Sequence, residues 1–271
     1  MVLKVQPLKL KLTAYGLSDI GLVRQNNEDV WGSVPEHHFY ALADGMGGHQ
    51  AGEVASREAI LFLCNYIRGE LENKSPEEYG SSQIVALMER AIQATNRCVY
   101  EMSTSHELLK GMGTTLCCLY VHDEYAVYAH VGDSRIYRLR GGRLEQLTQD
   151  HSLLRELIDQ GLHYQQTAET QQYKNIITKA IGTEDSIETS IHCSLICPND
   201  IYLLCSDGLS DVLSKAELEE CLNQPYTVEE KVRALIHNAK HKGGFDNITV
   251  VLVEVTANTT SCANFPTENC T

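Results

Sequence analysis

Four apolar runs of this sequence each meet an aspartate at one end. The runs HFYALAD, YAVYAHVGD and IYLLCSD stop at Asp44, Asp133 and Asp207, and in GGFDNITVVLV the order is reversed, with Asp246 before the run. Short runs rich in β-branched and aromatic residues, bounded by Gly or Asp, are typical of buried strands. The sequence therefore predicts a β-rich fold in which several carboxylates lie at strand ends.

Two interpretations fit these aspartates. Asp44-Gly45 and Asp207-Gly208 could each be a hairpin turn, because Asp-Gly is a strong turn signal. A turn, however, requires neither the acidic pair Glu28-Asp29 nor the dipeptide Asp246-Asn247. We therefore interpret the whole set as carboxylates that bound cations hold together.

The length and charge of the chain limit its architecture and its partners. With 271 residues it can bury a large core, so we expect one domain over residues 1–256 and a polar, disordered tail over residues 257–271. Asp and Glu number 36 against 22 Lys and Arg, and the net charge of −14 argues against binding to nucleic acid or to an anionic membrane.

No apolar stretch reaches the roughly 18 residues of a membrane span, and the opening residues alternate like a strand instead of forming a signal peptide. We expect a monomer in the cytoplasm.

Helices are predicted between the strands. In residues 81–103 apolar side chains recur at spacings of three and four, and a second such stripe follows Gly52. Capping boxes that begin at Ser214 and Thr227 each predict the start of a further short helix. Strands occur in runs and helices in pairs, without strict alternation, which favours an α+β fold of antiparallel sheets covered by helices.

The carboxylate cluster suits some ions and reactions better than others. Carboxylates, backbone carbonyls and water are hard ligands that favour Mg²⁺, Mn²⁺ or Ca²⁺, whereas zinc would require His or Cys. The sequence has no EF-hand loop, so a two-metal hydrolase and a purely structural metal site remain. Two ions about 3.5–4 Å apart can activate a bridging water for in-line attack on phosphorus. Arg24, four residues before Glu28, favours a phosphate substrate because a guanidinium binds phosphate bidentately, although on its own it would be interpreted as a surface arginine.

Taken in order, the motifs resemble those of a known family. Six of them carry the resemblance: Arg24-Gln25-Asn26-Asn27-Glu28-Asp29, Asp44-Gly45-Met46-Gly47-Gly48-His49, Gly113-Thr114-Thr115, Gly132-Asp133-Ser134-Arg135, Ser206-Asp207-Gly208 and Asp246-Asn247. Each is weak alone, but in this order they resemble the metal-dependent protein phosphatases of type 2C, in their bacterial form, over roughly residues 14–255. The resemblance implies a four-layer α-β-β-α sandwich with two central antiparallel β-sheets and helices on both outer faces. It also implies hydrolysis of phosphoserine and phosphothreonine in proteins by in-line attack of a metal-bridging water.

The same resemblance implies roles for individual residues. Two core ions, Mn²⁺ or Mg²⁺, would be held by Asp44, Asp207 and Asp246 and the carbonyl of Gly45, with Glu28 and Asp29 acting mostly through water. Asp133 would hold a possible third ion together with Asp207. Arg24 would clamp the phosphate, and we expect it to form the catalytic set with Asp44, Asp207 and Asp246.

Neighbouring positions receive lesser roles. Arg135 is expected to support the turn at Asp133, and Thr114 and Thr115 to start a strand. Residues 150–186 match a variable flap beside the cleft and open with a helix that we expect Asp150 to cap. Such a loop either contributes to substrate specificity or is a surface insertion without function.

One position departs from the eukaryotic members of the family. They carry a histidine directly after the metal-binding Asp-Gly, placed to protonate the leaving alkoxide, and here that position is Met46. A metal-bound water, whose pKa can fall to around 7, and His49 are the two candidate acids. We favour the water, because general acid help from a side chain contributes typically 10²–10⁴ and matters less for an activated leaving group.

Three functions of different classes stay open. We expect a phosphatase that acts on phosphorylated proteins and opposes a Ser/Thr kinase. The alternatives are a phosphatase of small phosphoesters and a non-catalytic phosphoprotein-binding module. The last requires lost ligands, and every expected metal position here keeps its carboxylate.

Overall fold

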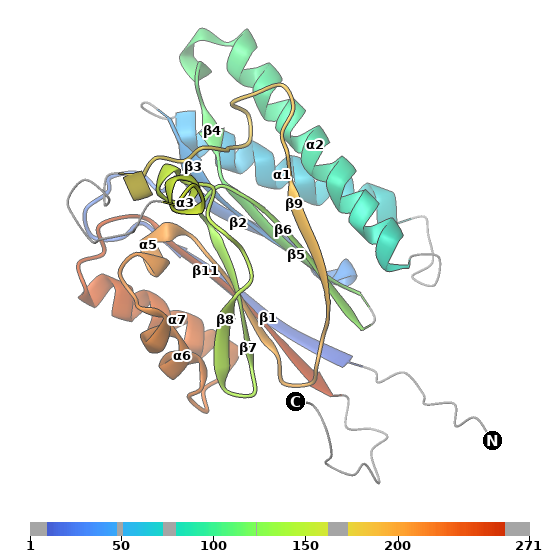
Figure 1. Cartoon of the computed structure of the whole chain (residues 1–271), viewed down its shortest axis with the longest axis vertical. Helices are drawn as coiled ribbons and strands as arrows, with labels where there is room; N and C mark the ends of the chain where they lie inside the picture. The colour runs from blue at the N-terminus through green and yellow to red at the C-terminus, as the bar shows by residue number, and fades with distance from the viewer. Residues whose placement is uncertain (1–9, 48–50, 73–79, 123, 162–172, 258–271) are drawn as a thin grey trace.

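Two antiparallel sheets pack face to face in the computed structural model, which describes residues 10–47, 51–72, 80–122, 124–161 and 173–257 (Figure 1). The first sheet has the strand order β1 (Leu10–Asp19), β11 (Ile248–Ala257), β10 (Ile201–Cys205), β7 (Arg135–Arg140) and β8 (Arg143–Gln146). The second has the order β2 (Asp29–Val34), β3 (Phe39–Met46), β5 (Leu116–His122), β6 (Tyr125–Val131) and β9 (Ser190–Leu195), with the short β4 (Gly113–Thr114) paired to β3. Every one of these strand pairs is antiparallel, as expected.

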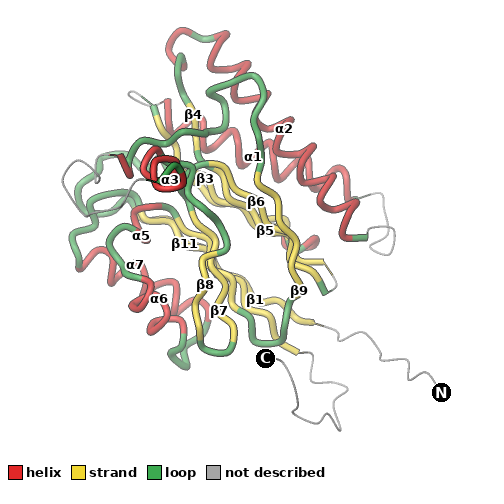
Figure 2. Tube along the Cα trace, in the orientation of Figure 1, coloured by secondary structure: helices red, strands yellow, loops and turns green. Residues whose placement is uncertain are grey.

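Helices cover both outer faces of the sheet pair (Figure 2). The long helices α1 (Ala51–Leu71) and α2 (Ser81–Ser105) pack on the second sheet, and α6 (Lys215–Leu222) and α7 (Val228–His241) pack on the first. The shorter α3 (Leu153–Asp159) and α5 (Asp207–Ser210) lie in connections between strands. The predicted four-layer α-β-β-α sandwich is therefore confirmed.

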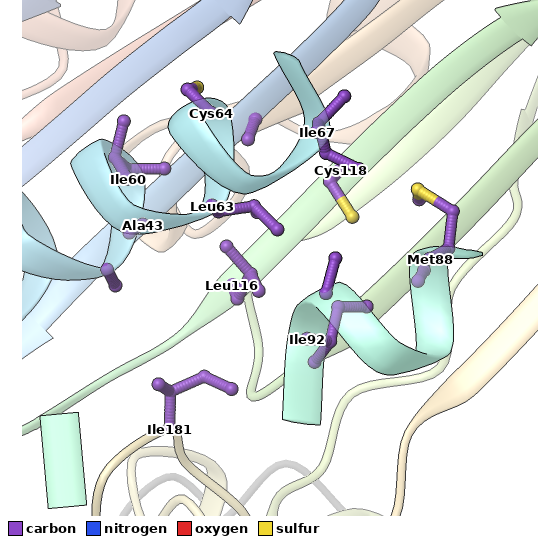
Figure 3. Close-up of a cluster of buried hydrophobic side chains, with 14 of the residues drawn as sticks. Ala43, Ile60, Leu63, Cys64, Ile67, Met88, Ile92, Leu116, Cys118 and Ile181 are labelled. Atoms are coloured by element: carbon purple, nitrogen blue, oxygen red, sulfur yellow. The ribbon is translucent and has the colours of Figure 1, made fainter. Parts of the chain in front are cut away.

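Strand alternation divides the apolar side chains among three cores. In β3, Ala41 and Ala43 face the core under α1 and α2, whereas Tyr40 and Leu42 face the core between the sheets. Figure 3 shows the first of these cores, in which side chains of α1 and α2 meet those of β5. Because Asp44 keeps the parity of Tyr40 and Leu42, its side chain belongs on the side of β3 that faces the other sheet.

Local signals at helix starts give one correction. The capping boxes at Ser214 and Thr227 both form, as predicted. The flap helix α3, however, is capped by Ser152, whose Oγ accepts a hydrogen bond from the Arg155 N–H at 3.4 Å, and not by Asp150. No helix within the described residues combines the length and apolar character needed to cross a membrane.

Candidate metal and phosphate site

Polar side chains replace the apolar core at one end of the space between the sheets. Asp29, the first residue of β2, is paired with Asp44 of β3 in the antiparallel register. From the other sheet, Ser206 directly follows β10, and its Oγ donates a hydrogen bond to Asp29 Oδ2 at 2.7 Å. Asp207 comes next and is the first residue of α5, so it begins a short helix after the strand. The two sheets are thus joined directly at the expected metal ligands.

The backbone of Asp44 is held by two threonines. Its N–H donates to Thr115 Oγ1 at 2.9 Å, and its carbonyl accepts from the Thr115 N–H and from Thr114 Oγ1, each at 2.8 Å. Thr115 Oγ1 also lies 2.8 Å from the hydroxyl of Ser134, the neighbour of Asp133. The threonines therefore position an expected ligand, a role beyond the strand start that the sequence suggested.

Close backbone contacts explain Gly45. Its N–H donates to the Glu28 carbonyl at 3.0 Å, and a Cβ at this position would overlap the carbonyl oxygen of Gly52 in α1. A Cβ on Gly52 would in turn overlap the carboxylate of Glu28. Glycine at both positions lets β3, α1 and the acidic pair approach one another.

Like charges accumulate at this end of the sandwich. Burial raises the pKa of Asp44 well above its ordinary value, and the carboxylates of Asp29, Asp207, Asp133 and Asp246 raise it further. Burial is also the main cause that raises the pKa of Asp207, followed by the charge of Asp133. The pKa of Asp29 is raised by burial as well, although the Ser206 hydrogen bond opposes this change. Ionised carboxylates so arranged repel one another, and a divalent cation would remove that repulsion.

Two buried oxygens fit such a cation. Asp29 Oδ1 and Asp207 Oδ1 have no hydrogen-bond partner among the described residues. Buried oxygens of this kind cost free energy unless something binds them. In the same part of the chain, no three His, Cys, Asp or Glu side chains converge closely enough to bind an ion by themselves. Backbone carbonyls and water would therefore complete the coordination, as is usual for Mg²⁺. Because the two buried oxygens need a partner, we conclude that these residues fit bound ions.

Arg24 lies at the solvent edge of the carboxylates. Its Nη2 donates to Asp246 Oδ2 at 2.7 Å, and the two side chains are 55% and 35% exposed. The other oxygen, Asp246 Oδ1, accepts the N–H of Asn247 at 2.8 Å. Asp246 is therefore shared between the expected ion site and the expected phosphate clamp.

Asn247 organises the segment that carries Arg24. It is 5% exposed, its Oδ1 accepts the Glu28 N–H at 2.8 Å, and its Nδ2 donates to the carbonyls of Ile20 and Asn26 at 3.0 and 2.9 Å. One side-chain amide thus fixes the chain on both sides of the arginine. The sequence indicated Asn247 only as part of a motif, without this positioning role.

Asp133 lies in a second acidic group beyond Asp207. Burial raises the pKa of Asp133 to about 6, and the charges of Asp150 and Asp211 contribute to the increase. Arg135 binds Asp150 bidentately, with Nε to Oδ1 at 2.8 Å and Nη2 to Oδ2 at 2.5 Å. Arg135 therefore joins β7 to the start of the flap.

Met46 occupies the position at which eukaryotic members carry a histidine. Met46 ends β3 and packs against Gly113, and its thioether has no proton to donate. His49 lies outside the described residues. The preference for water over His49 stays a prediction.

Comparisons with known proteins agree with this arrangement. A family model described as protein phosphatase 2C matches residues 21–256. The serine/threonine phosphatase stp of Listeria innocua is 38% identical over 240 residues, which are 88% of this chain and 93% of that protein. The solved structure of the Mycobacterium tuberculosis serine/threonine phosphatase PstP/Ppp is 36% identical, with a TM-score of 0.80, and the match covers 90% of this chain and 99% of that one. A PstP catalytic domain described in complex with two manganese ions is also 36% identical, with a TM-score of 0.79 over 92% of this chain and 100% of that one. The chain therefore belongs to the protein phosphatase 2C family.

Proposed function

We propose that this chain is a metal-dependent protein serine/threonine phosphatase. The observation that carries the proposal is the contact of Asp29 and Asp44 in one sheet with the Ser206-Asp207 end of the other, beside the exposed guanidinium of Arg24. Two buried oxygens there, Asp29 Oδ1 and Asp207 Oδ1, have no hydrogen-bond partner among the described residues. Family membership supports the reaction class, since relatives named serine/threonine phosphatase match over nearly their whole length.

Two Mn²⁺ or Mg²⁺ ions are proposed at the carboxylates. The similar PstP domain is described in complex with two manganese ions, which supports their number. Their ligands would be Asp44, Asp207, Asp246 and the carbonyl of Gly45, with Glu28 and Asp29 acting mostly through water, and Asp133 would share a third ion with Asp207. When bound, such ions activate water for in-line attack and neutralise charge on the phosphoryl oxygens.

The side chains of the protein orient the phosphate. The guanidinium of Arg24 is planar and permanently charged. A phosphate dianion would replace Asp246 as its partner, because charge-assisted bidentate hydrogen bonds to phosphate are strong. Asn247 keeps the Arg24 segment in place, and Thr115 keeps Asp44 in place. The site is therefore assembled before substrate arrives, which lowers the cost of orienting the reacting groups.

An open site suits a segment of a phosphorylated protein. Arg24 is more than half exposed, and the pocket of about 560 Å³ beside the flap is lined by Arg135, Asp150 and Asp211 and by none of the proposed ion ligands. We therefore propose phosphorylated proteins as substrates and a Ser/Thr kinase as the opposing enzyme. We also propose that the phosphatase is a monomer in the cytoplasm, where ATP-dependent kinases act.

Residues 1–256 would form the catalytic domain with a flap at 150–186. The tail, 257–271, lies almost wholly outside the described residues, so its disorder stays a prediction.

Phosphate release from a phosphothreonine peptide and from a small aryl phosphate, compared at equal concentration with Mn²⁺ and with a chelator, tests the proposal. We expect a higher kcat/KM for the peptide and no turnover in chelator. A higher kcat/KM for the aryl phosphate would favour a phosphatase of small phosphoesters. Binding of the peptide without hydrolysis in Mn²⁺ would favour a non-catalytic phosphoprotein-binding module.

A further inference from the structure

Three apolar side chains that are more than half exposed lie on the two segments that carry Arg24 and Asp246. Leu22, Val23 and Phe245 are 63%, 60% and 63% exposed. Single exposed apolar residues are common on protein surfaces, but several of them on two linked segments beside a site indicate an interaction surface. We call these three residues the apolar rim.

The rim is held together by links between its two segments. The Leu22 N–H donates to the Gly244 carbonyl at 2.8 Å, and Arg24 Nη2 donates to Asp246 Oδ2 at 2.7 Å. Val23 and Phe245 are the residues between these two links. Both apolar side chains are therefore next in sequence to a member of the proposed phosphate site.

The backbone under the rim is fixed. Gly21 has a φ of +81°, and a Cβ there would overlap the carbonyl oxygen of Asp246, so glycine allows the two segments to touch. Asn247 Nδ2 holds the Ile20 carbonyl at 3.0 Å. Leu22 and Val23 are therefore exposed on a segment whose backbone is held in place beside the proposed ligands.

Two charged pairs lie near the rim. Arg24 pairs with Asp246, and Lys240 pairs with Asp19 at 2.9 Å. A charged substrate side chain would gain little from neutralised pairs at the surface, whereas an apolar one would remove the rim from water.

We propose that the apolar rim binds apolar side chains that flank the phosphoamino acid of a protein substrate. This proposal rests on the proposed function and adds a substrate class to it. The occupant follows from continuity with the phosphate clamp, since Val23 precedes Arg24 directly. An extended peptide advances about 3.2–3.4 Å per residue, so side chains within two positions of the phosphate come within reach of the rim.

Two phosphothreonine peptides test the rim. They are identical except that one has leucine, and the other serine, at the two positions on each side of the phosphothreonine. With Mn²⁺ present, we expect the wild-type kcat/KM to be roughly 5- to 30-fold higher for the leucine peptide, the effect of burying one or two apolar contacts. In Phe245→Ser and in Val23→Ser this ratio should fall toward one.

Leu195→Ser is the matched control. Leu195 is 57% exposed, and it pairs with Tyr125 at the far end of β6 from Gly132 and Asp133. The change removes a similar apolar surface away from the site, so the ratio should stay at its wild-type value. Melting temperatures of all three variants should remain close to that of the wild type, because each position is exposed.

Other outcomes would overturn the rim. Equal kcat/KM for the two peptides in the wild type, or an unchanged ratio in both rim variants, would show that the rim does not bind flanking apolar side chains. The proposed function would be unaffected by that result. Hydrolysis of an aryl phosphate but of neither peptide would overturn both. A wild-type dimer in sedimentation that Phe245→Ser converts to a monomer would show that a second copy covers the rim, which also excludes the peptide as its occupant.

Discussion

Replacing Arg24 by alanine should weaken substrate binding far more than it weakens the fold. Within the described part of the chain the guanidinium pairs with Asp246, and both side chains reach solvent. Exposed pairs of this kind contribute about 0.2–1 kcal/mol to folding. A loss of that size lowers the melting temperature of a large domain by at most about 2–4 °C. Hydrogen bonds to a charged phosphate contribute about 1.5–3 kcal/mol, so the KM of a phosphopeptide should rise roughly 10- to 150-fold.

Steady-state kinetics on a phosphothreonine peptide at saturating Mn²⁺ measures the effect. KM should rise more than kcat falls, and Arg24→Lys should give an intermediate KM because it keeps the charge but loses the planar fork. Mn²⁺ affinity without substrate should not decrease in Arg24→Ala, since Asp246 Oδ2 is then released from its ion pair. An unchanged KM in Arg24→Ala would remove this residue from the site.

Three further predictions concern residues around the site. Arg135→Met removes the bidentate partner of the half-buried Asp150 carboxylate and leaves it only the long hydrogen bond from Gln146. The free energy of unfolding in denaturant should therefore fall, by less than the roughly 3–5 kcal/mol typical of a fully buried pair. A loss no larger than that of Arg97→Met, which breaks an exposed pair, would contradict this. Asp133→Ala should lower kcat at limiting Mn²⁺ and leave KM unchanged, and a drop in tight-site metal stoichiometry would instead place Asp133 among the core ligands. Burial lowers the pKa of His151 from 6.5 to about 4. The unfolded chain therefore takes up this proton first as the pH falls through that window, and the unfolding free energy decreases; a pH slope in His151→Gln equal to that of the wild type would refute this.

The fold was predictable where local patterns decide it. Alternation in β3 separates Tyr40 and Leu42 from Ala41 and Ala43 in the sequence, and the structure buries the two pairs in different cores. The cap of α3 was mispredicted because Asp150 binds Arg135, and nothing in the local sequence around the helix indicates that ion pair.

The sequence indicated the carboxylates that lie together, and their role as metal ligands stays a prediction. It did not indicate the residues that hold them in place. The family resemblance identified Asp29 and Asp44, which the structure pairs across β2 and β3. It did not indicate that Ser206 donates a hydrogen bond to Asp29, 177 positions away. Nor did it indicate that Asn247 Oδ1 accepts the N–H of Glu28, 219 positions away. Such contacts depend on how the two sheets are stacked, and a local motif does not contain that information.

Turnover of a phosphothreonine peptide after exhaustive chelation, followed by titration with Mn²⁺, tests the proposed metal site most directly. Because Asp29 Oδ1 and Asp207 Oδ1 are buried without a hydrogen-bond partner among the described residues, we expect no turnover until Mn²⁺ is added and full recovery afterwards. Asp207→Asn should remain inactive at every Mn²⁺ concentration while circular dichroism shows a folded protein, because Asp207 lies at the start of a four-residue helix and outside the apolar cores. Full activity in the chelated wild type, or in Asp207→Asn, would contradict a metal-dependent phosphatase built on these carboxylates.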